Sequence, residues 1–276
     1  MRIYITFGDE KYKKTRDFSA KMAKIVGNFD RVIAYGPEDI DNDFKQKHAD
    51  IFRISRGYGL WLWKPYLIYK TLMKECDAGD LLFYGDGGSF FIRSVRHIEL
   101  SMGGDDIWVT HNSLLEWQFT KREAFELMGC QGERFEKTQQ AQGGFLLIRK
   151  TEKSVAFIKE WLNLCCDIRL LHPDNIFSNA QNPSGFRAHR EDQSVLSLLC
   201  KKNGIDLHQD PTQYGKYPEK YWQKGVFLQK TSTEKEYPVC VLLHRTPTLN
   251  ILTILRQYCL VLLPRCMGLR MISYVK

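Results

Sequence analysis

The sequence predicts an α/β fold, a single domain with a mostly parallel central sheet flanked by helices. Strand-like and helix-like segments alternate along the chain, which is typical of this fold class. The nearly unbroken apolar run over residues 80–84 is typical of a buried parallel strand. No linker interrupts the chain before its last segment, so we expect one domain over residues 1–248 and a tail over residues 249–276.

Periodicity predicts the elements of the first half in order. Residues 2–7 alternate and are rich in β-formers, which indicates a strand. A helical pattern covers residues 12–26, with Phe18, Met22 and Ile25 on its apolar face, and Gly27-Asn28 ends it. The segments that follow are strands over 31–35, 51–54 and 80–84, and a helix over 60–76 whose apolar face carries Leu67, Ile68, Leu72 and Met73.

The second half continues the alternation. Glu123 follows Thr120 by three residues, the spacing of a capping box, and predicts a helix that ends at Gly129. The other predicted segments are helices over 94–102, 154–166 and 191–203, strands over 107–110 and 145–149, and loops over 130–143 and 172–188. The second loop is unusually long for a compact domain, and such loops are often functional.

Composition narrows the function classes. The chain has 276 residues, 43% of them hydrophobic, which argues against a disordered or fibrous protein. Its net charge of +8 suits an anionic partner, but the basic residues are scattered and carry no nucleic-acid motif, so we expect no nucleic acid. Eight cysteines without a CxxC pair exclude a zinc ribbon, and the N-terminus has no signal-peptide core, which predicts a cytoplasmic protein.

A carboxylate followed by two glycines, Asp86-Gly87-Gly88, comes directly after the predicted strand over 80–84. Ligands bind outside the carboxyl ends of strands in open α/β sheets, and a carboxylate there can hold a divalent cation against a diphosphate. His244, after the apolar run over 239–243, is a candidate second ligand. The alternatives are an Asp-Gly turn between strands and a structural histidine.

Two tryptophans and a lysine begin the helix predicted after residue 60. Lys64 is placed to face a phosphate, and Trp61 or Trp63 to stack on a base or a sugar. The alternative is that the tryptophans belong to the core and that Lys64 is solvated.

Two further clusters lie at predicted element ends. Asp192 and Gln193 open the helix after the long loop, where they would hydrogen-bond sugar hydroxyls; the alternative is that acids at this helix start simply complement its dipole. Gly143 and Gly144 precede a buried strand, which indicates a close approach of a ligand or of another backbone.

Taken in order, these motifs resemble bacterial glycosyltransferases of the GT-A type, in particular those of capsule and O-antigen gene clusters, with a layout similar to glycosyltransferase families 8 and 32. The likeness covers residues 1–246 and rests on residues 6–9, 57–65, 80–89 and 143–144, the Asp192-Gln193 pair and His244. It implies a GT-A-like, Rossmann-related domain that moves a hexose from a nucleotide-sugar donor, a UDP-sugar, to a saccharide acceptor. It also implies a lipid-linked acceptor in surface polysaccharide synthesis and a cofactor of Mn²⁺ or Mg²⁺.

The resemblance further implies a role for each site residue. Asp86 would be the first carboxylate of an Asp-x-Asp motif and, with His244, would hold the cation. The catalytic pair would be Asp192 and Gln193, beside the transferred sugar or the acceptor. The remaining donor-binding residues would be Thr6, Phe7 and Gly8 at the nucleotide, with Tyr12 as a weaker addition, Lys64 at the phosphate, and Gly143 and Gly144 beside the sugar.

Two departures from the family pattern leave alternatives open. Gly88 stands where the second Asp of the motif is the usual metal ligand, and Gln142-Gly143-Gly144 stands where related families often carry Asn-Ser-Gly. Asp192 would be the base of an inverting enzyme, whereas the Asp-Gln likeness favours retention. The alternative function is a non-catalytic nucleotide- or carbohydrate-binding protein on the same fold.

The tail over residues 249–276 combines apolar stretches with cations and no acids. Arg256, Arg265, Arg270 and Lys276 lie among leucines, isoleucines and valines, which suits a helix on an anionic membrane surface. The run is too short and too polar to span a bilayer. We therefore expect a peripheral association with the inner face of the cytoplasmic membrane, with a helix packed on the core as the alternative.

Overall fold

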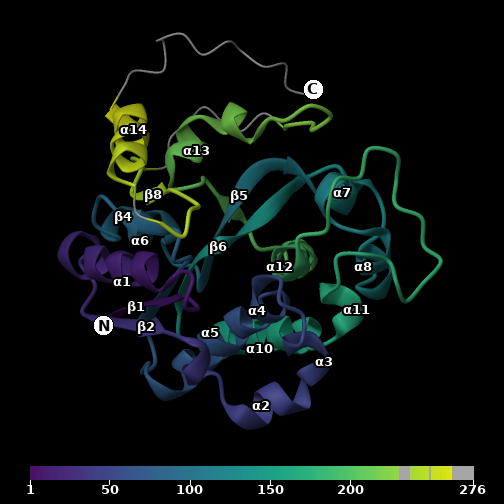
Figure 1. The fold of residues 1–276 in the computed structure, drawn as a ribbon, viewed down its shortest axis with the longest axis horizontal. Coiled ribbons are helices and arrows are strands. Elements are labelled where there is room, and N and C mark those ends of the chain that lie inside the picture. The colour runs from purple at the N-terminus through teal and green to yellow at the C-terminus, as the bar shows by residue number, and fades with distance from the viewer. Residues whose placement is uncertain (230–236, 249, 263–276) are drawn as a thin grey trace.

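A six-stranded sheet with the order β2-β1-β3-β6-β5-β7 forms the centre of the computed structural model (Figure 1). The structure describes residues 1–229, 237–248 and 250–262. β6 alone is antiparallel to its neighbours, so the sheet is mostly parallel, as predicted. Its strands are β1 (Arg2–Phe7), β2 (Arg31–Tyr35), β3 (Leu81–Gly85), β5 (Ile107–Leu115), β6 (Gln139–Arg149) and β7 (Leu207–His208).

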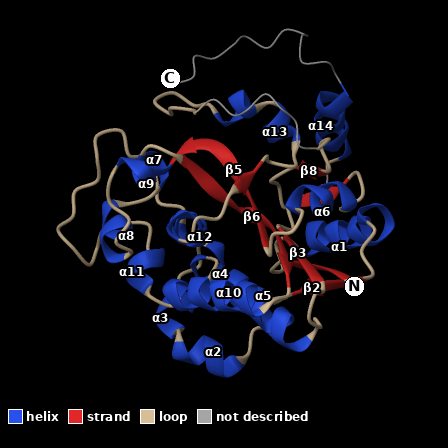
Figure 2. Ribbon diagram, turned by 180° about the vertical axis from the view of Figure 1, so that it is seen from behind, coloured by secondary structure: helices blue, strands red, loops and turns tan. Residues whose placement is uncertain are grey.

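Helices cover both faces of this sheet (Figure 2). The inward side chains of β1 alternate between two apolar clusters, because successive residues of a strand point to opposite faces. Ile3 and Ile5 face α5 (Trp63–Lys74), α10 (Glu152–Cys165) and α12 (Glu191–Lys202). Tyr4 faces the side of α1 (Lys13–Met22), η1 (Ala23–Gly27), α6 (Arg96–Met102) and the small sheet of β4 (Ser89–Phe91) and β8 (Val241–Leu243).

Short elements complete the described part of the chain. They are η2 (Pro37–Asp39), α2 (Asn42–Lys47), α3 (Ala49–Phe52), α4 (Gly57–Leu60), α7 (Glu116–Phe119), α8 (Arg122–Leu127), α9 (Glu133–Glu136), α11 (Ile168–Leu171), α13 (Gln213–Lys216), η3 (Pro218–Tyr221) and α14 (Ile251–Leu262).

Two predicted segments are wrong. Residues 51–54 were expected as a strand, but α3 and the turn after it occupy them; a short apolar run around Ile51 fits either state. Residues 130–143 were expected as a loop, but they contain α9 and the first part of β6. Gln140 is fully buried in that strand, and its amide donates to Glu116 Oε1 and to the Phe119 carbonyl, so the polar sequence conceals a buried strand.

Four local predictions also fail. Lys121, not Thr120, precedes the first residue of α8, and the Thr120 hydroxyl donates to Glu116 at 2.5 Å, so no capping box forms. Ile25 is 65% exposed, because the helix continues into the π-helical turn η1, which rotates Ala23 rather than Ile25 inward. Met73 is exposed on α5. β5 is longer than predicted, because irregular pairing lets it follow β6 beyond residue 110.

The helix α14 lies within the predicted tail and beside α13 (Figure 1). Lys216 Nζ donates to the Val261 carbonyl at 2.6 Å and ties the end of α14 to α13. The exposed side chains of α14 are largely apolar: Ile251, Leu252, Leu255 and Tyr258. The predicted tail cations Arg265, Arg270 and Lys276 lie outside the described residues. No helix in the described part of the chain is long and apolar enough to cross a membrane.

Candidate functional site

A cleft of about 660 Å³ opens where the carboxyl ends of β1 and β3 meet the middle of β6. This is the place where open α/β sheets bind ligands. The predicted site residues that line it are Phe7, Gly8, Tyr12, Asp86, Gly144 and Gln193. The others are buried outside its lining: Thr6, Lys64, Gly143, Asp192 and His244.

Lys64 lies beneath the cleft, between two carboxylates. Its Nζ is 2.8 Å from Asp192 Oδ2 and 3.7 Å from Asp86 Oδ1, and it donates to the Gly143 carbonyl at 3.1 Å. The side chains of Lys64 and Asp192 are only 4% and 5% exposed, whereas that of Asp86 is 42% exposed. Lys64 is thus neither solvated nor in reach of a ligand in the open cleft, and its ammonium joins α5, β6 and α12 at one point.

The buried Lys64–Asp192 pair perturbs both ionisations. Burial raises the pKa of the Asp192 carboxyl to about 7, although Lys64 opposes this shift. Burial disfavours the Lys64 ammonium, but the negative charges of Asp192 and Asp86 raise its pKa above the ordinary value. Lys64 therefore stays protonated at neutral pH and is the main electrostatic partner of the buried carboxyl.

Asp86 is held in the turn between β3 and β4. Its backbone N–H donates to the Gly144 carbonyl at 3.0 Å, and the Tyr84 hydroxyl donates to Asp86 Oδ1 at 2.6 Å. The Ser89 hydroxyl donates to the Asp86 carbonyl at 2.7 Å and closes the turn. Asp86 therefore belongs to a turn, as one alternative expected, and also presents a fixed carboxylate to the cleft.

The glycine pair of β6 lets the side chains of Asp86 and Gln193 approach the strand closely. A Cβ atom on Gly144 would lie 3.1 Å from Asp86 Oδ2, and one on Gly143 would lie 3.2 Å from the Cβ of Gln193. Gly143 N–H donates to Gln193 Oε1 at 3.2 Å, while Gln193 Nε2 donates to Gln140 at 2.7 Å. The close approach predicted for these glycines is therefore made by Asp86 and by the first turn of α12.

Aromatic side chains form another wall of the cleft. Trp63 is buried and stacks on Phe7 with ring centroids 3.8 Å apart, and it lines the cleft together with Tyr58 and Trp61. Residues 57–61 all have positive φ values between 52° and 84°, a left-handed turn that costs L-residues about 1–2 kcal/mol each. Gly57 and Gly59 reduce that cost. The Gly-x-Gly spacing was a signal of this turn that the sequence reading did not use.

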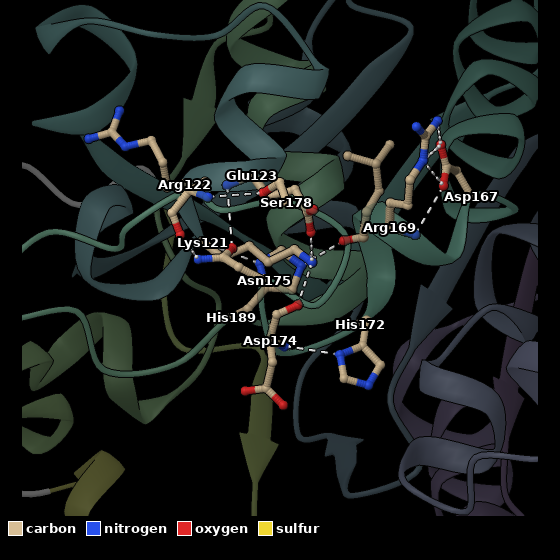
Figure 3. Close-up of polar contacts among 12 residues, drawn as sticks. Lys121, Arg122, Glu123, Asp167, Arg169, His172, Asp174, Asn175, Ser178 and His189 are labelled. Atoms are coloured by element: carbon tan, nitrogen blue, oxygen red, sulfur yellow. Dashed lines mark hydrogen bonds and ion pairs between the residues drawn. The ribbon is translucent and has the colours of Figure 1, made fainter.

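The long loop is fixed through a buried polar cluster that Figure 3 shows. Lys121 Nζ pairs with Glu123 at 2.8 Å and donates to the Asp174 carbonyl at 2.9 Å. His189 links Lys121 N–H to the Leu170 carbonyl through its two ring nitrogens, and burial lowers the pKa of this imidazole to about 3. None of residues 172–188 lines the cleft, and hydrogen bonds from Lys121, Arg122 and Glu123 hold this loop against the start of α8.

The predicted metal ligands do not form a metal site by themselves. His244 is buried, and its Nε2 has no hydrogen-bond partner in the described part of the chain, which suits a ligand. Its backbone N–H donates to the Gly88 carbonyl at 2.9 Å. However, no group of three or more His, Cys, Asp or Glu side chains among the described residues could hold a metal ion. Asp86 and His244 would leave most positions of an octahedral cation to other ligands.

Cationic residues of the cleft are the feature that sequence reasoning largely missed. The cleft lining contains four cationic side chains and two carboxylates, Asp9 and Asp86. The cations are Lys11, Arg56, Arg190 and Arg245. The sequence shows these residues but not their convergence, because they are spread over more than two hundred positions and meet only in the fold.

Comparison with known proteins finds similar solved structures at low sequence identity. No protein-family model and no curated protein sequence matches the chain. Mouse xyloside xylosyltransferase 1 in its apo form matches with 9% identity over 89% of this chain and 98% of that chain, at a TM-score of 0.46. The galactosyltransferase LgtC in complex with donor and acceptor sugar analogues matches with 15% identity over 96% and 98%, at 0.48.

A third solved structure is the apo form of the glycosyltransferase GlyE of Streptococcus pneumoniae TIGR4. It matches with 14% identity over 95% of this chain and 60% of that chain, at a TM-score of 0.45. At these identities and TM-scores the matches do not identify a function, which has to be argued from the cleft.

Proposed function

We propose that the chain is a glycosyltransferase that moves a sugar from a nucleotide-sugar donor, a UDP-sugar, to a saccharide acceptor. The observation that carries the proposal is the placement of Asp86: an exposed carboxylate at the carboxyl end of β3, against the glycine pair of β6, in a 660 Å³ cleft. Carboxylates bind sugar hydroxyls, and glycines let a bulky ligand approach the backbone. The motif order of the sequence supports the same reading.

The walls of the cleft offer contacts both to the rings of such a donor and to its diphosphate. The half-buried rings of Tyr58 and Trp61 in the cleft lining offer stacking surfaces to a base or a sugar ring. The excess of cations over carboxylates suits the negative charge that develops on the leaving diphosphate when the glycosidic bond breaks. Asp86 and Gln193, on the side of the glycine pair, are left to contact the sugar.

The burial of Asp192 supports a positioning role for this residue. Its carboxylate lies below the glycine pair and is paired with Lys64, so it has no open path to an acceptor hydroxyl. The neighbouring Gln193 lies in the cleft lining instead. The burial of Asp192 fits a mechanism in which this residue is not the base that an inverting enzyme needs.

The function is tested with a panel of UDP-, GDP-, CMP- and dTDP-sugars, with and without Mn²⁺. We expect one donor class to raise the melting temperature of the full chain and to be hydrolysed slowly without an acceptor. Stabilisation without any hydrolysis, also after addition of saccharide acceptors, favours the non-catalytic binding protein. No response to any donor contradicts the proposal.

The glycine pair provides a prediction that separates activity from stability. Gly144→Ala places a methyl group about 3.1 Å from Asp86 Oδ2, and the partly exposed carboxylate has to move away. We expect donor hydrolysis to fall about tenfold or more, since small displacements of a catalytic group are costly, with a nearly unchanged melting temperature. Gly104→Ala, where no atom lies within 4 Å of the new Cβ, is the matched control. Equal activities of the two variants would argue against a role for this contact.

A lipid-linked acceptor of surface polysaccharide synthesis, and with it a peripheral membrane location, is part of the proposal. The support is the exposed apolar side of α14 and the basic composition of residues 249–276. We expect the full chain to sediment with anionic phospholipid vesicles and Leu252→Glu/Leu255→Glu to stay in the supernatant. Leu127→Glu/Leu100→Glu, at exposed leucines outside α14, should sediment like the wild type. A wild-type chain that does not sediment contradicts the membrane proposal alone.

A further inference from the structure

One position of the cleft, Gly88, lacks the carboxylate that a metal-dependent diphosphate site would have there. Gly88 stands where the resemblance expects a metal-binding carboxylate, and it lines the cleft next to Arg245. The N–H groups of His244 and Arg245 both donate to the Gly88 carbonyl, at 2.9 and 3.2 Å. A Cβ on Gly88 would lie 3.5 Å from the Cα of Arg245. The residue beside the missing carboxylate is therefore an arginine.

Arg245 and Arg190 form no ion pair within 4 Å in the described part of the chain; the carboxylates whose charges act on them, Asp210 on Arg245 and Glu191 on Arg190, lie farther away. Each guanidinium stacks on aromatic rings instead: Arg245 lies 4.5 Å from the Tyr214 ring centre, and Arg190 lies 4.7 Å from that of Phe119. Stacking fixes the plane of a guanidinium and leaves its N–H groups free to bind an anion. Arg56, by contrast, is paired with Glu191 at 2.7 Å.

The two guanidinium groups also act on each other. Burial lowers the pKa of Arg190, and the nearby positive charge of Arg245 lowers it further. The charges of Glu191 and Asp210 offset part of this repulsion, and a bound anion would offset more of it. An arginine pair with free N–H groups is suited to a phosphate, which it binds through two parallel hydrogen bonds.

We propose that Arg245 and Arg190 bind the diphosphate of the donor directly, so that donor binding does not require a divalent cation. This inference rests on the proposed function, because a nucleotide sugar supplies the dianionic diphosphate. It assigns to the two guanidinium groups the neutralisation of charge that an Asp-x-Asp metal site would provide. At Gly88 the chain therefore lacks a metal-binding carboxylate, and in our proposal arginines take over the contact with the diphosphate.

The first test is calorimetric titration of the full chain with UDP, GDP, CDP and dTDP, in EDTA and in Mn²⁺. We expect one nucleoside diphosphate to bind with similar affinity in both conditions. Arg245→Gln should weaken that binding about tenfold or more in EDTA, as expected for loss of a charge-assisted phosphate contact. Arg134→Gln is the matched control, because Arg134 also stacks on an aromatic ring at 4.5 Å but lies outside the cleft.

The second test restores the missing carboxylate. Gly88→Asp has space for its Cβ and no positive φ to oppose it. The new carboxylate should repel the diphosphate in EDTA, and Mn²⁺ should recover the binding. The same variant thus turns a cation-independent site into a cation-dependent one, and circular dichroism checks that it folds.

The outcomes separate this inference from the proposed function. Binding of a nucleoside diphosphate by the wild type only in Mn²⁺, with Arg245→Gln unchanged, overturns the inference and leaves the glycosyltransferase proposal intact. Binding of none of the four in either condition overturns both. Similar binding in both conditions that Arg245→Gln does not weaken also overturns the inference, since the anion is then held elsewhere.

Discussion

Lys64→Met is expected to lower the free energy of unfolding by about 3–5 kcal/mol and to abolish sugar transfer. The substitution leaves the Asp192 carboxylate buried below the glycine pair without its partner, and it removes the donor to the Gly143 carbonyl. An unpaired buried charge is among the most destabilising changes that a single substitution makes. Urea denaturation measures the loss of stability, and the donor assay measures transfer.

The matched control is Lys70→Met on the same helix. Lys70 pairs with Asp41 at 2.6 Å, but the Asp41 side chain is 55% exposed, so this ion pair should contribute at most about 1 kcal/mol. The double variant Lys64→Met/Asp192→Leu should recover much of the stability, because no charge is then left unpaired, while transfer stays abolished. Equal effects of Lys64→Met and Lys70→Met would contradict the account of the buried pair.

The stability loss of Lys64→Met should also depend on pH. Lys64 lowers the pKa of Asp192, so its removal raises that pKa further above the value of about 7. A carboxyl whose pKa is higher in the folded state binds protons preferentially when folded, and lowering the pH toward the unfolded value of about 3.9 then stabilises the fold. Below about pH 7 the Asp192 carboxyl is protonated in both folded proteins, so the wild type and the variant gain stability in parallel and the defect stays nearly constant. The defect should shrink as the pH falls from alkaline values to about 7, where only the folded variant holds this proton, and a defect that grows over that range would contradict the argument.

Asp86→Ala is expected to reduce sugar transfer about a hundredfold to a thousandfold, the range found when one fixed electrostatic group is removed from an active site. Asp86 is the carboxylate that the turn after β3 presents to the cleft, and its side chain is 42% exposed. Its loss should cost little stability, since a solvated carboxylate contributes little to folding. Steady-state rates with the best donor and the melting temperature test both parts.

Two variants sharpen this prediction. Asp86→Asn keeps the size of the side chain and the acceptor for the Tyr84 hydroxyl but removes the charge, so it separates charge from shape. Asp17→Ala removes a carboxylate that is 53% exposed and lies outside the cleft, and should leave transfer unchanged. Near-normal transfer by Asp86→Ala would remove this residue from the site.

Local periodicity was sufficient to predict much of the fold. β1, β2 and α12 begin and end within one residue of their predicted bounds, because alternation, helical spacing and glycine stops are local signals. The first part of β6 was missed for a physical reason: its polar residues are buried with partners such as Glu116, and sequence patterns do not show such pairing.

The candidate site was predictable as a set of residues but not as an arrangement. Asp86 could be placed at a strand end from the sequence alone. Lys64 and Asp192 are far apart in the chain, and they meet only because α12 packs against β6 while the Lys64 side chain reaches from α5 to the Gly143 carbonyl of that strand. The convergence of Arg190 and Arg245 on one cleft likewise depends on long-range packing, which a single sequence does not carry.

The most direct test of the central claim compares the wild type with Asp86→Ala in one assay: release of free nucleotide from the panel of nucleotide sugars by the full chain. The account predicts release from one donor class by the wild type and a loss of that release in a folded Asp86→Ala variant. Release that survives in the variant, or no release from any donor by the wild type, would contradict the proposal that this cleft transfers sugars.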